Sequence, residues 1–91
     1  MAAAGDLHAW RARIDSMDAA LVRLLRERVR VARRLGERKL AAGLPLKAPE
    51  REAEVLARVA AMADATLPAA SLERVFRAII DETLEAERVA A

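Results

Sequence analysis

An uninterrupted amphipathic stretch over residues 6–41 constrains the fold of this chain more than any other feature of its sequence. The stretch contains no proline, and its apolar residues recur at intervals of three, four and seven. Two neighbouring rows read Leu7, Ile14, Leu21, Arg28, Leu35 and Trp10, Met17, Leu24, Val31. Residues at these intervals share one face of an α-helix. The pattern therefore predicts a helix of roughly 50 Å, for which Asp6 is a suitable N-cap.

Two shorter helices are expected to follow, each preceded by a proline-containing turn. Residues 43–49 contain two prolines and one glycine, and Pro49 suits the first turn of a helix over residues 50–63. Residues 64–68 form the second turn, after which Ser71 is expected to cap the third helix. No stretch alternates as a strand would. The sequence predicts an all-α chain of three helices, a single domain over residues 1–91 with residues 1–5 disordered.

The composition predicts that this chain associates with another copy. Hydrophobic residues make up 55% of the 91 residues, but alanine is the commonest of them, and only Trp10 and Phe76 are aromatic. A chain this small buries a thin core. Its first helix is about twice as long as the others and would leave apolar surface exposed. An intertwined helical homodimer would cover that surface.

Several classes of function are not supported. The chain has no cysteine, and His8 is its only histidine, so we expect no metal site and no thiol or histidine nucleophile. With 16 basic and 14 acidic residues it carries a mixed surface, and we expect no nucleic-acid partner. No signal peptide and no membrane span are recognised. The expectation is a cytoplasmic domain without cofactors.

Polar residues on the apolar helix faces are the candidate functional residues. A buried charge is costly unless an opposite charge meets it. These residues are Arg11, Asp18, Arg28, Lys39, Glu52, Thr83 and Glu87, with Arg51 beside Glu52. Internal ion pairs would explain any one of them, and Asp18 is interpreted as the structural partner of a nearby arginine. Without Asp18, four cations face two carboxylates, and a small dianion would balance the surplus.

The spacing along the first helix indicates how such a site is assembled. Arg28 and Lys39 are 11 positions apart, or about 16 Å, and both side chains could reach one ligand. Arg11 and Arg28 are 17 positions apart, or about 26 Å, which is too far for one small ligand. If Arg11 belongs to the same site, it must therefore come from a second chain. Cations, a hydroxyl and acids suit chemistry by positioning and electrostatics.

The motifs that carry these residues resemble one family. They are WRARIDSMDAAL at 10–21, LLRER at 24–28, Lys39, GLPL at 43–46, PEREAEVL at 49–56 and FRAII at 76–80. Over nearly its whole length the chain resembles the all-helical chorismate mutases of the AroQ class, which are intertwined dimers of three-helix chains. The resemblance implies an isomerase of the shikimate pathway that converts chorismate to prephenate, toward Phe and Tyr, without cofactor or metal.

The resemblance also implies a role for each site residue. Arg28 and the partner's Arg11 would bind the two substrate carboxylates, with Arg51 in support. Lys39 would donate to the ether oxygen whose bond breaks, and would also contact a carboxylate. Glu52 would bind the ring hydroxyl. The remaining lining would be Thr83, where the family often has serine, and the apolar residues Leu35, Ile80 and Leu84.

Two positions depart from the family pattern. Glu87 stands where many members carry glutamine as a second donor to the ether oxygen. Only a protonated carboxyl can donate a hydrogen bond, so activity is expected to fall as the pH rises. Ala48 stands where the family usually has an aspartate that helps to bind the ring hydroxyl. Without this aspartate, the contact with the hydroxyl would be left to Glu52.

Because Ala48 replaces the usual aspartate, substrates other than chorismate remain alternatives. Isochorismate-pyruvate lyases share this fold and can have alanine at this place, although Glu52 is retained here as in the mutases. An amino-deoxychorismate mutase is a further alternative on the same fold. A non-catalytic helical dimer that binds a partner is the alternative from another class, and it predicts that the cations are paired internally.

Overall fold

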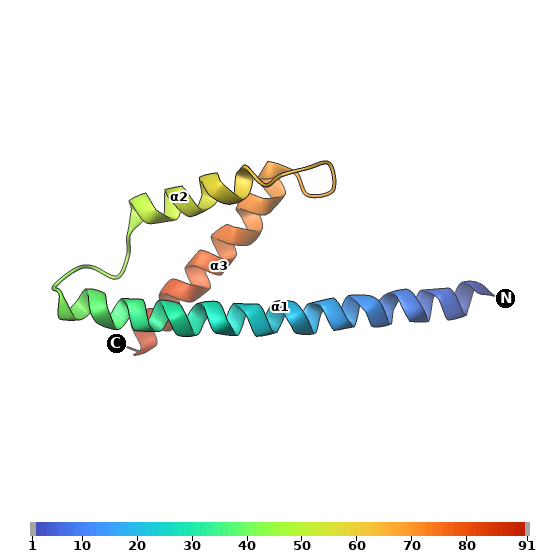
Figure 1. The fold of residues 1–91 in the computed structure, drawn as a ribbon, viewed down its shortest axis with the longest axis horizontal. Coiled ribbons are helices and arrows are strands. Elements are labelled where there is room, and N and C mark those ends of the chain that lie inside the picture. Colours follow the sequence, from blue (N-terminus) through green and yellow to red (C-terminus); the bar gives the residue numbers. More distant parts are fainter. Residues whose placement is uncertain (1, 91) are drawn as a thin grey trace.

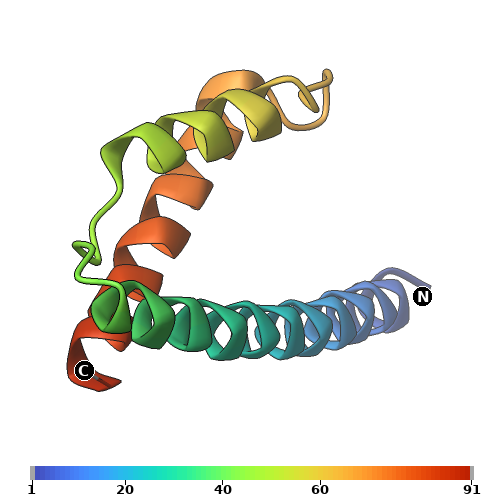
Figure 2. The same ribbon diagram turned by 60° about the vertical axis from the view of Figure 1, so that its left-hand side comes forward.

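The computed structural model describes residues 2–90, which form three helices and no strand. Helix α1 spans Ala2–Ala41, α2 spans Pro49–Ala60 and α3 spans Ala69–Ala90. In Figure 1, α1 is a straight rod, and α3 runs obliquely from α2 back to the C-terminal part of α1. Figure 2 shows that α1 and α2 lie near opposite ends of α3 and extend from it to the same side. The predicted all-α, three-helix chain is confirmed.

The helix boundaries differ from the predicted ones where a capping residue was inferred. Helix α1 begins at Ala2, so Asp6 lies within it and is not its N-cap. Helix α3 begins at Ala69, directly after Pro68, so Ser71 is not its cap either. Helix α2 does start at Pro49, as expected, but it ends at Ala60 rather than near residue 63. The disorder predicted for residues 1–5 stays a prediction.

The turns are closed by local hydrogen bonds that the sequence explains. After α1, Gly43 adopts a positive φ of 73°, and the backbone N–H of Leu44 donates to the carbonyl of Lys39 over 2.8 Å. This is the glycine-terminated helix end that turns the chain sharply. Before α3, the side chain of Asp64 accepts hydrogen bonds from the backbone N–H groups of Thr66 and Leu67. The first turn joins α1 to α2, and the second joins α2 to α3.

Helix α3 holds the fold together because it packs against both other helices. Its contact with α2 buries Val55 and Val59, and Ile80 is buried on α3 itself. Its contact with α1 is close at Gly36, where a Cβ atom would lie 3.3 Å from the Cγ atom of Glu87. A larger residue at Gly36 would push α1 and α3 apart. Glu87 and Thr83 are therefore buried at this crossing.

Much of the apolar face of α1 is uncovered. The chain measures 63 × 27 × 14 Å, and the N-terminal half of α1 extends beyond the other two helices (Figure 1). Its exposed apolar side chains are Leu7, Trp10, Ile14, Met17, Leu21, Val22, Leu24 and Leu25, and farther along Val31, Leu35 and Leu40. Among the described residues, no helix is long and apolar enough to cross a membrane.

Candidate active site

A cavity of about 620 Å³ lies between the C-terminal half of α1, the start of α2 and the second half of α3. It contains all of the predicted site residues except Arg11. Its lining consists of Leu24, Glu27, Arg28, Val31, Ala32, Leu35, Lys39, Leu46, Ala48, Arg51, Glu52, Val55, Ile80, Thr83, Leu84 and Glu87. The positions came together because one face of α1 and one face of α3 meet at Gly36. The roles predicted for these residues stay predictions.

Arg28 is oriented by a hydroxyl on the neighbouring helix. Its Nη1 donates to the Oγ1 atom of Thr83 over 2.9 Å, and that hydroxyl donates to the carbonyl oxygen of Ile79 over 2.7 Å. The guanidinium has five N–H donors in a rigid plane, so one bond fixes its direction and the others remain for a ligand. Thr83 therefore acts on the cavity through Arg28.

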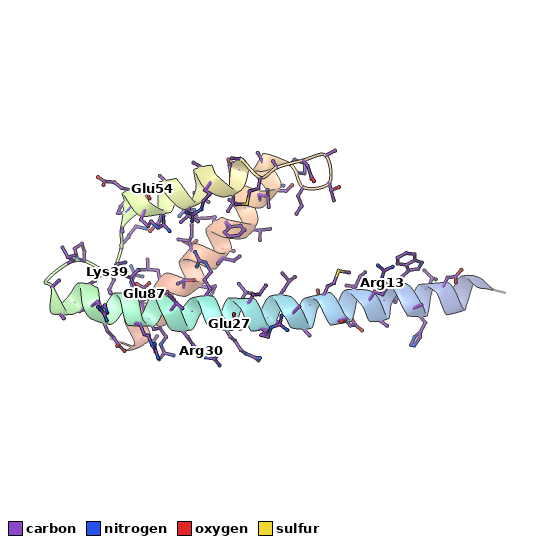
Figure 3. The ribbon with its side chains drawn as sticks, in the orientation of Figure 1. Arg13, Glu27, Arg30, Lys39, Glu54 and Glu87 are labelled. Atoms are coloured by element: carbon purple, nitrogen blue, oxygen red, sulfur yellow. The ribbon has the colours of Figure 1, made fainter. Side chains whose placement is uncertain are left out.

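Lys39 on α1 and Glu87 on α3 both line the cavity, and their side chains lie near the crossing of these helices (Figure 3). The Nζ atom of Lys39 donates to the carbonyl oxygen of Leu46 over 3.0 Å. Glu87 is only 7% exposed, and among the described residues its Oε2 atom has no hydrogen-bond partner. A buried polar atom without a partner is costly, and a ligand oxygen in the cavity would supply the missing partner if Glu87 carries a proton.

The lining of the cavity holds three cations and three carboxylates, so the surplus of positive charge predicted from the sequence is not present in the single chain, but two of the cations have no carboxylate partner. Arg28 bonds to a hydroxyl and Lys39 to a backbone carbonyl, and neither lies within 4.0 Å of a carboxylate oxygen among the described residues. Internal ion pairing therefore does not explain these two cations. An anionic ligand would explain them, because Arg and Lys bind carboxylates strongly when water is largely excluded.

The carboxylate of Glu52 is the best-paired group of the site. It accepts hydrogen bonds from Arg77 Nη1 over 2.8 Å and from Lys47 Nζ over 3.0 Å. These two bonds, that from Arg77 foremost, hold the pKa of Glu52 below its usual value, although burial acts in the opposite direction. Glu52 is thus an ionised acceptor at the Ala48 end of the cavity. The neighbouring Arg51 is directed to Glu54 over 3.2 Å and is exposed.

Two acidic or basic residues of the predicted cluster lie outside the cavity. Arg11 is exposed on the uncovered half of α1, as its distance along the helix required. Asp18 is also exposed and forms no ion pair with the residues that the structure describes, so its interpretation as a structural partner of an arginine is wrong for the single chain.

The contacts of Lys47 and Arg77 with Glu52 were not predicted from the sequence. Lys47 lies in the turn before α2, and Arg77 is one position from the apolar row of α3, so neither stands on a core-facing row. The contact of Arg77 with Glu52 spans 25 positions and depends on how α2 packs against α3. The adjacency of Lys47 to Ala48 was the only local signal.

Comparisons with known proteins agree with the family resemblance. The family described as "Chorismate mutase type II" matches residues 10–88. A bifunctional chorismate mutase/prephenate dehydratase of Aquifex aeolicus is 34% identical over 87 residues, which cover 91% of this chain and 24% of that protein. A protein of the same name from Neisseria gonorrhoeae is 41% identical over 75 residues, covering 82% of this chain and 20% of that protein.

A third relative differs in its named substrate. The 4-amino-4-deoxychorismate mutase of Streptomyces pristinaespiralis is 40% identical over 87 residues, covering 94% of this chain and 67% of that protein. The chain thus spans a quarter or less of the two bifunctional relatives, but most of this one. No solved structure matched significantly.

Proposed function

The chain belongs to the type II chorismate mutase family, and we propose that it converts chorismate to prephenate in the cavity between its three helices. The observation that carries the proposal is the pair Arg28 and Lys39, two cations in one cavity without a carboxylate partner among the described residues. Chorismate, a dianion, supplies the missing carboxylates. A place in Phe and Tyr biosynthesis and a cytoplasmic location belong to this proposal.

The chemistry needs positioning and charge stabilisation only. In the rearrangement the ether C–O bond breaks while a C–C bond forms in the same molecule, and no proton or cofactor takes part. Arg28 holds a carboxylate, and the apolar side chains Leu35, Ile80 and Leu84 enclose the ring. Negative charge builds on the ether oxygen as its bond lengthens. Lys39 and a protonated Glu87 donate to that oxygen, so their bonds strengthen in the transition state.

A second copy of the chain completes the site. The uncovered apolar face of α1 begins at Leu7 and passes Arg11, which is exposed and lies far from its own cavity. A second α1 packed antiparallel on this face would bury the apolar row and bring its own Arg11 to the cavity. The dimer then has two equivalent sites, and in each the partner's Arg11 binds the second carboxylate.

The role assigned to Glu87 predicts a pH dependence. Glu87 can donate to the ether oxygen only as a protonated carboxyl, and a rise in pH can only deplete that form. We expect kcat to be higher near pH 5 than near pH 8, and Glu87→Gln, whose amide donates at every pH, to remove this fall. Steady-state rates of both proteins across that range test the expectation. A flat profile for the unsubstituted protein would contradict it.

A second candidate substrate is 4-amino-4-deoxychorismate. Ala48 lines the cavity at the Glu52 end, and the Streptomyces pristinaespiralis relative is named for this substrate. Without a second carboxylate beside Glu52, the recognition of the ring substituent rests on Glu52 and its neighbours.

The experiment that tests the proposed function is a product assay on purified protein. Chorismate, isochorismate and 4-amino-4-deoxychorismate are offered separately near pH 5 and near pH 7.5. Prephenate from chorismate as the fastest reaction is the expected result. Pyruvate and salicylate from isochorismate would instead assign a lyase. No turnover of any of the three would favour the non-catalytic dimer.

A further inference from the structure

The cluster formed by Lys47, Glu52 and Arg77 contains one carboxylate and two cations, and it borders the cavity at Ala48. The Oε1 atom of Glu52 accepts from Arg77 over 2.8 Å, and its Oε2 atom accepts from Lys47 over 3.0 Å. The Glu52 side chain is 13% exposed, whereas those of Arg77 and Lys47 are 45% and 52% exposed. The carboxylate is therefore held at the cavity wall by cations that approach from the solvent side.

We propose that Arg77 and Lys47 are positioning residues that fix the Glu52 carboxylate as an acceptor, and that their charge selects a substrate with a neutral hydroxyl over one with an ammonium group. The inference rests on the proposed function, because Glu52 is there assigned to the ring substituent. It concerns specificity at that substituent and leaves the bond-breaking end of the site unchanged.

The argument from charge separates the two ring substituents. A hydroxyl needs only an acceptor, and a carboxylate has about four lone-pair sites, so Glu52 can accept from the substrate as well as from its two cations. An aliphatic amine is largely protonated near neutral pH. Its charge would meet a Glu52 carboxylate that already bonds to two cations, and Ala48 offers no second carboxylate in the cavity. The cluster therefore weakens the binding of a substrate that carries an ammonium group, but not the binding of one that carries a hydroxyl.

The direction of the Glu52 pKa gives a second readout. Asp81 on α3 lies 3.9 Å from Arg77, and the other charged groups that line the cavity are Glu27, Arg28, Lys39, Arg51 and Glu87. Because Arg77 lowers the pKa of Glu52 most strongly, its removal must raise that pKa. Glu52 would then become protonated at a higher pH, and any loss of chorismate binding that follows from its protonation would begin at a higher pH.

The test compares Arg77→Gln with two matched variants. Arg77→Lys keeps the positive charge, and Asp81→Asn removes the neighbouring contact without touching Glu52. We expect Arg77→Gln to raise KM for chorismate by about fivefold with a smaller change in kcat. It should narrow the preference for chorismate over 4-amino-4-deoxychorismate by a similar factor. Arg77→Lys should keep most of the chorismate affinity and of the substrate preference of the unsubstituted protein. Asp81→Asn should change neither quantity.

A measurement without turnover completes the test. Carboxyl carbon NMR of ¹³C-labelled protein, with the Glu52 signal assigned from Glu52→Gln, should show a higher Glu52 pKa in Arg77→Gln than in the unsubstituted protein. An unchanged Glu52 titration would overturn the positioning role. A shifted titration with an unchanged substrate preference would overturn the selection by charge while the mutase function stands. No turnover of either substrate by the unsubstituted protein would overturn the proposed function and this specificity with it.

Discussion

Arg28→Ala should reduce kcat/KM for chorismate by about 10³-fold, because it removes the one arginine that the chain directs into its own cavity from α1. The loss has two physical parts. A charged hydrogen-bonding partner of a substrate carboxylate disappears, and that carboxylate is then partly desolvated without compensation. Thr83, which accepts the bond from Arg28 over 2.9 Å, loses its partner as well, but a hydroxyl beside an open cavity can bond to water.

The controls for Arg28→Ala lie on the same helix. Arg30 lies on the side of α1 opposite to α2 (Figure 3) and does not line the cavity, so Arg30→Ala should leave the rate within about twofold. Arg28→Lys keeps the charge but loses the planar fork and should recover only part of the activity. Calorimetric titration with a cyclic diacid that mimics the transition state should give saturable binding that Arg28→Ala abolishes. Undiminished binding would show that the anion lies elsewhere.

Most residues that the sequence proposed for the site line one cavity, because helical periodicity converts residue spacing directly into position in space. Arg28, Leu35 and Lys39 are spaced by seven and four positions, and any straight helix brings them to one face. Thr83 and Glu87 are four positions apart on α3 and follow the same rule. Once both faces were identified by their polar residues, their meeting at one cavity followed from burying the apolar positions between them. Arg11 was excluded from the same cavity by helix rise alone.

The start of α1, the start of α3 and the bonds of Lys47 and Arg77 to Glu52 were not predicted correctly, for different reasons. Asp6 and Ser71 are chemically suited to cap a helix, but residues before them can also be helical, so a good cap does not forbid an earlier start. The bond between Arg77 and Glu52 depends on the rotation of α3 against α2. An arginine side chain is long enough to reach several positions from one site on a helix, and no periodicity distinguishes those positions.

Arg11 separates the single chain from the proposed dimer. Arg11→Ala should reduce activity about as strongly as Arg28→Ala, although Arg11 lies about 26 Å along α1 from Arg28. A ligand in the cavity of a lone chain has no contact with Arg11. A loss of activity without a loss of helical content by circular dichroism would therefore already indicate that Arg11 acts on another chain.

Mixing the two inactive variants should restore activity. When Arg11→Ala and Arg28→Ala chains are unfolded together and refolded, half of the dimers are mixed, and one of the two sites in each mixed dimer has both arginines. About a quarter of the activity of the unsubstituted protein should return. The matched control mixes Arg28→Ala with the double variant Arg11→Ala/Arg28→Ala, which offers no intact site in any combination. Recovery in the first mixture alone would place Arg11 across the interface, whereas recovery in neither would confine both arginines to one chain and remove the basis for the shared site.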